Sequence, residues 1–346
     1  MAFDRGAALG YPFASVSLAL ARLDLLLTRF RSLRALVIGD LMLDEFLWGR
    51  VRRLSPEAPV PVVEVQRSSR FPGGAANVAR NLLEFTPRVT LCGAVGDDPS
   101  GQELTQALKD TGCDVSGIRR IPGRPTTLKT RVFGRQQQIV RVDRETRDGL
   151  PSAAREELAD FLRQTIPACD LILLEDYAKG LLDQEITDLV LTEAARAGKL
   201  TAADPHTHNR LSWKGVSVLK PNRSEVLALS GMEDPEESLA SVEKAARLLR
   251  ERSGCRHLLV TLGEEGMLLL DETNQSRRIP TAAREVFDVS GAGDTSLCLF
   301  SLALAAGSES WEAAKLANLG AGIVVGKLGT ATVSAEELRA HLSTSP

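Results

Sequence analysis

The sequence predicts an α/β fold: a central, mostly parallel sheet flanked by helices, with a small β lid beside it. The first apolar run, 35–38, shows no alternation of polar and apolar residues, which indicates a strand buried on both faces. Similar runs recur later and each ends in a polar cluster, at 171–174, 200–203, 216–219 and 258–261. Ligands of open α/β sheets bind outside the carboxyl ends of the strands, so the clusters predict a functional site at one sheet edge.

The composition is that of an ordinary globular protein. The chain has 346 residues, of which 43% are hydrophobic and 25% charged, and its net charge is −3. This balance does not favour an extended nucleic-acid surface. The five cysteines show no metal or redox spacing, so we expect buried free thiols in a reducing compartment: Cys92, Cys113, Cys169, Cys255 and Cys298.

The chain divides into an N-terminal helical extension, 1–34, and one large α/β domain, 35–346. The apolar stretch 16–27 contains Arg22 and Asp24, so it is too short and too charged for a membrane span or a signal peptide. Its leucines fit an amphipathic helix that lies on the domain. We therefore expect a cytoplasmic protein without a membrane partner.

Acidic residues follow the first predicted strand, and a flap follows them. Asp40 and Asp44 could accept hydrogen bonds from sugar hydroxyls, although aspartates at such places also form turns. Two prolines and partial alternation at 59–65 predict an edge strand with one exposed face. We assign segments 45–70 and 120–145 to the lid.

A second glycine turn leads into an alanine-rich helix. Gly73 and Gly74 would let a ligand approach the backbone, and Asn77 offers a donor and an acceptor to a polyol. Helix packing explains the same small residues equally well. A strand at 89–95 and a helix at 101–110 are expected next.

The segment 126–143 is rich in cations. Lys129, Arg131, Arg135 and Arg141 accompany one acidic residue, and alternation places Lys129 and Arg131 on one face of a strand. Such a face suits a phosphorylated small molecule. A solvated edge strand protected by its charges is the alternative interpretation.

Beyond residue 170, the polar clusters contain candidates for nucleotide and metal binding. A helix is expected over 183–197. Asn222 and Glu225 are three residues apart at a helix start, so both could face one Mg²⁺ ion or its waters. The stretch 261–266, with Thr261, Gly263 and Gly266, would let the backbone approach a nucleotide. His206 and His208 are interpreted as structural or solvated rather than as metal ligands.

The most informative stretch is 286–295, Val-Phe-Asp-Val-Ser-Gly-Ala-Gly-Asp-Thr. A glycine turn followed by an apolar run that stops at Gly307 predicts a helix whose N-terminus binds an anion. A carboxylate beside an anion pocket repels a bound anion, so Asp294 is a candidate base that takes a proton from a hydroxyl attacking a phosphoryl group. The alternative is that Asp294 only caps the helix.

These motifs, in this order and spacing, resemble the ribokinase/PfkB family of sugar kinases over residues 35 to about 335. Within that family the chain is most similar to the kinases of heptose 7-phosphates. The stretches that carry this closer resemblance are 39–44, 54–62, 136–143, 176–180 and 324–330. The resemblance implies the ribokinase-like fold, a lid that pairs in a homodimer, and ATP and Mg²⁺ as cofactors.

The resemblance also implies residue roles. Asp294 would be the base, and the backbone N–H groups of Gly291, Ala292 and Gly293 would stabilise the transferring phosphoryl group. The nucleotide and Mg²⁺ would be bound by Asn222, Arg223, Ser224, Glu225, Thr261, Gly263, Gly266 and Asn318. The sugar phosphate would be held by Asp40, Asp44, Gly73, Gly74, Asn77, Lys129, Arg131, Arg141, Asp176 and Lys179. The loop around Asp288 is a candidate site for a monovalent cation such as K⁺.

The implied reaction is phosphorylation of the anomeric hydroxyl of D-glycero-D-manno-heptose 7-phosphate, a step towards ADP-heptose and lipopolysaccharide core. His206 stands where many relatives have lysine, which bears on the substrate assignment. The bifunctional versions carry a nucleotidyltransferase domain after the kinase, and we expect a separate enzyme to do that step here. The alternatives are a kinase of this family for another sugar, or a non-catalytic sugar-phosphate sensor.

Overall fold

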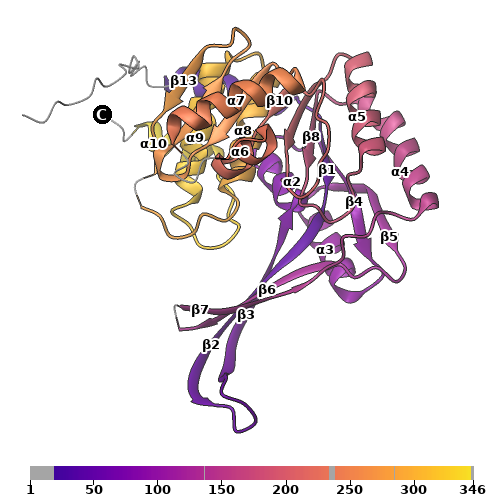
Figure 1. Cartoon of the computed structure of the whole chain (residues 1–346), viewed down its shortest axis with the longest axis vertical. Coiled ribbons are helices and arrows are strands. Elements are labelled where there is room, and N and C mark those ends of the chain that lie inside the picture. The colour runs from indigo at the N-terminus through magenta and orange to yellow at the C-terminus, as the bar shows by residue number, and fades with distance from the viewer. Residues whose placement is uncertain (1–18, 136, 234–237, 284, 344–346) are drawn as a thin grey trace, which may run out of the picture.

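The computed structural model describes residues 19–135, 137–233, 238–283 and 285–343, and the elements below refer to these ranges. Two sheets form the framework, a large one in the body and a smaller one that projects from it as the lid (Figure 1). The main sheet has the strand order β13-β12-β11-β10-β9-β8-β1-β4-β5. Neighbours from β11 to β5 pair in parallel, whereas β11–β12 and β12–β13 pair antiparallel, so the predicted, mostly parallel sheet is confirmed.

The main-sheet strands are β1 (Ala35–Gly39), β4 (Val89–Gly96), β5 (Asp114–Ile121), β8 (Leu171–Glu175), β9 (Leu200–Asp204), β10 (Val218–Leu219), β11 (His257–Thr261), β12 (Met267–Leu270) and β13 (Ser276–Ile279). The predicted strand at 216–219 is shorter than expected. The expectation of strands buried on both faces is correct, because successive side chains of one strand enter opposite cores. Val37 of β1 packs in one core and Leu36 and Ile38 in the other.

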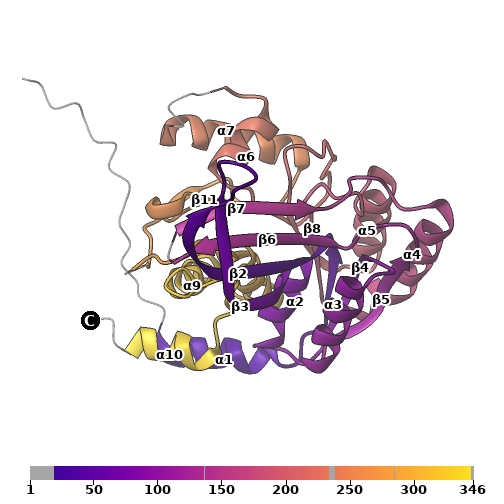
Figure 2. The same cartoon turned by 90° about the horizontal axis from the view of Figure 1, so that it is seen from below.

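Helices cover both faces of the main sheet (Figures 1 and 2). One core includes side chains from α1 (Leu20–Phe30), α2 (Ala75–Leu83), α3 (Pro99–Asp110), α8 (Ala292–Ala305), α9 (Ser310–Val324) and α10 (Ala335–Ser343). The opposite core includes side chains from α4 (Ser152–Thr165), α5 (Gln184–Arg196), α6 (Arg223–Ser230) and α7 (Leu239–Ser253). Short 3₁₀ turns occupy Ile166–Ala168 and Gly263–Glu265.

The N-terminal helix α1 is amphipathic. Leu23, Leu26 and Phe30 are fully buried, whereas Leu20 and Leu25 are exposed. It lies beside α10 (Figure 2), and Asp24 forms an ion pair with Arg339 of that helix. Residues 1–18, including Leu18 of the predicted pattern, lie outside the described ranges. No described helix combines the length and the apolar character needed to cross a membrane.

The lid is a four-stranded sheet in the order β3-β2-β6-β7. Its strands are β2 (Leu41–Leu54), β3 (Pro61–Gly74), β6 (Thr127–Gly134) and β7 (Gln137–Arg144). Phe46, Trp48 and Phe133 stack on one another with ring centroids 5.6 to 6.3 Å apart, which stiffens one face. The sheet therefore begins at residue 41 and ends at residue 74 on its first hairpin, wider than the expected 45–70.

All five cysteines are buried free thiols, as expected. Burial raises the pKa of Cys92 to about 12, so this thiol stays protonated and inert. The cysteines therefore belong to the core.

Candidate active site

The glycine turn at 291–293 lies at the N-terminus of α8, as the sequence predicts. Gly291 is the N-cap residue with φ of +82°, a conformation that L side chains rarely adopt, and Asp294 is the third residue of the helix. The Ala292 N–H donates to the carbonyl of Val289 over 3.3 Å. To contact a phosphoryl group, this N–H must first give up its hydrogen bond to Val289. The N-terminus of α8 as a whole, with its dipole, is therefore the main anion-binding feature.

Asp294 is a buried carboxylate held by two side chains from distant elements. Asn77 of α2 donates to Asp294 Oδ2 over 2.7 Å, and the Tyr177 hydroxyl donates to Oδ1 over 3.0 Å. Burial raises the pKa of Asp294, while the hydrogen bonds from Asn77 and Tyr177 oppose that rise. A carboxylate with a raised pKa is a stronger proton acceptor when ionised, which suits a general base.

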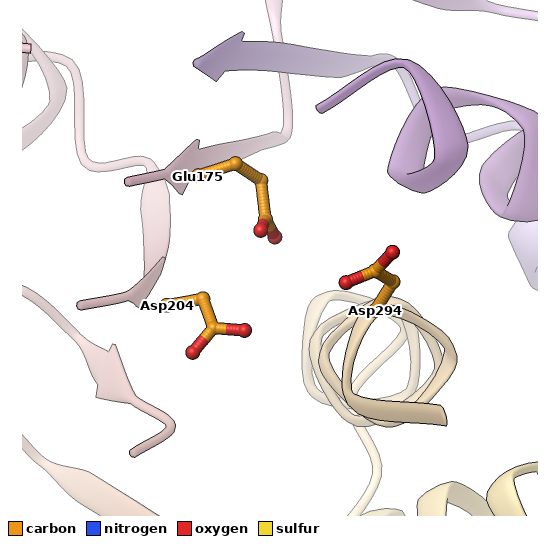
Figure 3. A group of neighbouring side chains, drawn as sticks. All are labelled: Glu175, Asp204 and Asp294. Carbon is orange, nitrogen blue, oxygen red and sulfur yellow. The ribbon is translucent and has the colours of Figure 1, made fainter. Parts of the chain in front are cut away.

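Asp294 also faces two carboxylates from neighbouring strands (Figure 3). Glu175 ends β8 and Asp204 ends β9, and oxygens of all three groups lie within 4.8 Å of one another. Glu175 is fully buried and neither of its side-chain oxygens has a partner. Burial, together with the charges of Asp204 and Asp294, raises the pKa of Glu175 well above its ordinary value, so its neutral acid form is favoured.

Lys220 supplies the compensating positive charge. Its Nζ lies 2.8 Å from Asp204 Oδ2, and a Cβ added to Gly293 would lie 3.3 Å from Nζ. Burial lowers the pKa of Lys220, but the nearby Asp204 and Glu225 outweigh it and raise the pKa to about 12. A charged ammonium therefore sits beside the helix N-terminus. We did not single out Glu175, Asp204, Tyr177 or Lys220 from the sequence, although each lies in a polar cluster at a strand end.

A cavity of about 890 Å³ lies beside Lys220 and Gly293. Its lining residues all come from the C-terminal half of the chain. Ala292, Gly293, Lys220 and Asp204 line its inner end. Every residue expected to bind the nucleotide also lines it: Asn222, Arg223, Ser224, Glu225, Thr261, Gly263, Gly266 and Asn318. The cavity therefore joins the predicted nucleotide residues to the open end of α8.

Asn222 and Glu225 form a capping box at the start of α6. Asn222 Oδ1 accepts the Glu225 N–H over 2.9 Å, and Glu225 Oε2 accepts the Asn222 N–H over 2.8 Å. One carboxylate oxygen of Glu225 is thus engaged in the cap. The other oxygen, together with Asp204, gives the cavity the hard oxygen donors that Mg²⁺ prefers, so the residues fit a hydrated magnesium ion.

The residues expected to hold the sugar divide into two groups. Asp44 lies in β2 and forms an ion pair of 2.6 Å with Arg131, and a Cβ on Gly73 would overlap its carboxylate. Gly74 precedes α2 with a φ of +58°. Of these four residues, it is Asn77 that contacts Asp294, whereas Asp44 and Gly73 lie against each other and Gly74 precedes the helix that carries Asn77.

Asp40 requires a correction. Its buried carboxylate accepts backbone N–H groups of Tyr177, Lys179 and Leu181 at 2.9 to 3.2 Å. Both oxygens are occupied by the loop after β8, so we no longer assign Asp40 to the substrate. It fixes the loop that carries Tyr177.

Asp176 similarly accepts the Ala178 N–H and an N–H of Asn209 through one oxygen. Its second oxygen is buried without a partner. Burial is the main cause that raises the pKa of Asp176 to about 6. This second oxygen is the one that a substrate hydroxyl could use.

The cations expected at the substrate phosphate all have carboxylate partners. Lys129 contacts Asp143 and Glu145, Lys179 contacts Glu145, and Arg141 contacts Asp143. Arg141 is half exposed on β7, whereas Lys129 and Lys179 are largely covered. Lys129, Lys179 and Arg131 are therefore the more covered of these cations.

Asp288 and the two histidines lie outside this constellation. Asp288 Oδ1 accepts the Ser290 N–H and Oδ2 accepts the Gly329 N–H, which joins two loops. The His206 and His208 rings are tilted against each other by 41° with centroids 5.1 Å apart, and the His208 N–H donates to His206 Nδ1. These contacts support the structural interpretation of the histidines.

Comparisons with known proteins agree with this geometry. The profile of the pfkB family of carbohydrate kinases matches residues 33–338. The "Bifunctional protein HldE" of Trichlorobacter lovleyi is 44% identical over 318 residues, which are 92% of this chain and 64% of that protein. The chain thus spans slightly less than two thirds of the length of this curated relative.

Solved structures of sugar kinases share the fold. Arabidopsis thaliana ribokinase in complex with ribose and ATP superposes with a TM-score of 0.71, at 19% identity, over 90% of this chain and 99% of that one. Phosphofructokinase-2 of Escherichia coli in complex with potassium gives a TM-score of 0.70, at 19% identity and the same two coverages. Because the family profile covers nearly the whole chain, this chain belongs to the pfkB family of carbohydrate kinases.

Proposed function

We propose that this sugar kinase uses ATP and Mg²⁺ to phosphorylate the anomeric hydroxyl of D-glycero-D-manno-heptose 7-phosphate, which yields the 1,7-bisphosphate. The observation that carries the proposal is the position of Asp294, held by Asn77 and Tyr177 where the nucleotide cavity meets the N-terminus of α8. The relatives named HldE, at 42–45% identity, support the heptose substrate.

In the proposed reaction, Asp294 takes the proton of the anomeric hydroxyl. The sugar oxygen then forms a bond to the γ-phosphorus of ATP, and the bond from that phosphorus to the β–γ bridging oxygen breaks to release ADP. Lys220 and the N-terminus of α8 stabilise the negative charge on the phosphoryl oxygens. Mg²⁺, oriented by Glu225 and Asn222 through its waters, would neutralise charge on the ATP phosphates.

The sugar is held at the base by Asp44 and Asn77, and its 7-phosphate by Lys129 and Lys179. Asn77 Oδ1 is buried without a partner, which supports a substrate donor at this point. Lys129 and Lys179 are largely covered and both contact Glu145, whereas the similarly covered Arg131 contacts Asp44. Asp288 is kept as the proposed site of a monovalent cation, since a potassium complex of a structural relative is known.

We also propose a homodimer that forms through the lid. Several large apolar side chains on its strands and connecting loop are 38–63% exposed: Val51, Leu54, Val60, Val65, Val140 and Val142. An exposed apolar group of this kind is typical of a protein interface. That a separate nucleotidyltransferase uses the product stays a prediction, because the matched relatives are named as bifunctional proteins.

A coupled assay of ADP release with ATP and Mg²⁺ tests the substrate. It compares D-glycero-D-manno-heptose 7-phosphate with ribose, fructose, fructose 1-phosphate and fructose 6-phosphate. Strong preference for the heptose phosphate is expected. Preferred turnover of another sugar would retain the kinase chemistry and overturn the substrate. Binding of sugar phosphates without any turnover would favour the sensor alternative.

A further inference from the structure

Two lysines from separate parts of the fold converge on one carboxylate, Glu145. Lys129 extends from lid strand β6, and Lys179 extends from the loop after body strand β8. Their Nζ atoms lie 3.3 Å and 2.6 Å from the two oxygens of Glu145, the residue that directly follows β7. The three side chains are only 11–19% exposed, so Glu145 bridges lid and body in a largely covered place.

This trio lies next to the residues proposed to hold the sugar. Lys129 is the register partner of Asp44 on the neighbouring strand β2. The Lys179 N–H donates to the same Asp40 oxygen as the Tyr177 N–H, and the Tyr177 hydroxyl contacts Asp294. A ligand between the lysines would therefore lie next to the sugar site, outside the residues that line the nucleotide cavity.

The charge around the trio favours an anion with more charge than a carboxylate. Two ammonium groups face the single charge of Glu145, and Lys129 shares Asp143 with Arg141. The pKa of His206 is lowered first by burial and by His208. The positive charges of Lys179, Arg147 and Lys129 lower this pKa further, so they lie close to His206. A phosphate monoester carries about −1.5 to −2 charges and three acceptor oxygens, more than a carboxylate offers.

We propose that Glu145 is an internal substitute for the substrate's phosphate group: it pairs with Lys129 and Lys179 in the free enzyme and leaves when a phosphate monoester takes its place. The proposal rests on the proposed function, in which the substrate is a sugar phosphate. It adds that Glu145 competes with the phosphate group of that substrate for the two lysines. Because the lysines belong to lid and body, the incoming phosphate would join the same two parts that Glu145 joins. Because a ligand must displace Glu145 from the lysines, Glu145 would lower the affinity for every sugar, and most for sugars that lack a phosphate.

A contrasting role is that Glu145 only orients the lysines for the ligand. The two roles predict opposite effects of Glu145→Gln, which removes the charge and keeps the size. If Glu145 competes, the variant binds inorganic phosphate more tightly, by about three- to tenfold, because a neighbouring negative charge is lost. If it only orients the lysines, the variant binds phosphate more weakly.

The test is isothermal titration calorimetry of the full chain with inorganic phosphate, without nucleotide. Glu64→Gln is the matched control, since Glu64 lies in lid strand β3, pairs with Arg52 at 3.7 Å and is 54% exposed. Lys179→Met should weaken phosphate binding in the wild-type and in the Glu145→Gln background. Equal affinities of the Glu145→Gln and Glu64→Gln variants, weaker binding by Glu145→Gln, or no effect of Lys179→Met would each overturn the proposal.

Hydrogen exchange of the wild-type protein gives a second measurement that needs no substitution at Glu145. Saturating inorganic phosphate should increase exchange in the segment that follows β7, because Glu145 loses both partners; unchanged or reduced exchange there would contradict the proposal. Failure of the proposed function is seen separately in the turnover assay. If the enzyme turns over heptose 7-phosphate but Glu145→Gln does not bind inorganic phosphate more tightly, only this inference is overturned. If Glu145→Gln binds phosphate more tightly but the enzyme prefers another sugar, only the proposed substrate is overturned.

Discussion

Tyr177 and Asp294, which are 117 residues apart in the chain, share a hydrogen bond of 3.0 Å in which the phenol donates to the carboxylate. Burial and the charge of Asp294 raise the pKa of Tyr177 well above its ordinary value, so the phenol remains a donor. Because Asn77 donates to the other carboxylate oxygen, the proposed base has one fixed orientation at the end of the cavity.

Replacing Asp294 with Asn should lower kcat by about 10²–10⁴-fold, because the variant keeps the shape and loses the proton acceptor. Steady-state kinetics with saturating ATP and heptose 7-phosphate measure the effect. Circular dichroism and ATP binding serve as controls for folding. A correctly folded variant with unchanged turnover would refute the assignment of Asp294 as base.

Replacing Tyr177 with Phe should lower kcat by about tenfold, since a charge-assisted hydrogen bond to the base is lost. That bond lowers the pKa of Asp294, so its removal raises this pKa, and the acidic limb of the kcat/KM profile should move to higher pH. Profiles of the wild type and the variant from pH 5 to 9 decide the matter. An acidic limb in the same place would show that Tyr177 does not set the ionisation of the base.

Replacing Gly73 with Ala should raise KM for the sugar with a smaller effect on KM for ATP. The added Cβ would overlap Asp44 Oδ2, so the carboxylate must move away from its place beside Arg131. Gly149→Ala is the matched control, because its added Cβ meets no atom within 4 Å. Equal sugar KM values for the two variants would remove Asp44 from the sugar site.

The stability of the Glu175→Gln variant, compared with that of the wild type, should increase as the pH rises. Burial raises the pKa of Glu175 above its ordinary value of 4.5, so the folded state holds this proton more tightly than the unfolded chain does. The resulting stability is fully present below pH 4.5 and is lost as the pH rises through the folded pKa. Glutamine does not titrate and escapes this loss.

Thermal unfolding of the ligand-free protein between pH 4 and 8 tests this. The Tm of Glu175→Gln relative to wild type should increase with pH, by on the order of 2 °C at pH 8. A constant difference at every pH would mean that Glu175 keeps an ordinary pKa in the folded protein.

The sequence by itself determined the local features of this protein. Glycine at 291 permits a positive φ, the apolar run that follows forms a helix, and the helix exposes its first N–H groups; all of this is encoded within about fifteen residues. The buried strands and the helix start at 222–225 were likewise predictable, because apolar runs and helix-start patterns are local signals.

Only the tertiary structure decided which groups meet across the sheet. The parallel pairing of β8 with β9 places Glu175 beside Asp204, and α8 brings Asp294 to both. The hairpin of β6 and β7 brings Lys129 close to Glu145, and the loop after β8 adds Lys179. Asp40 looked like a sugar ligand in the sequence but binds three backbone N–H groups. Strand order and register determine these contacts. The residues next to a side chain in the sequence do not specify which distant residue the sheet will place against that side chain.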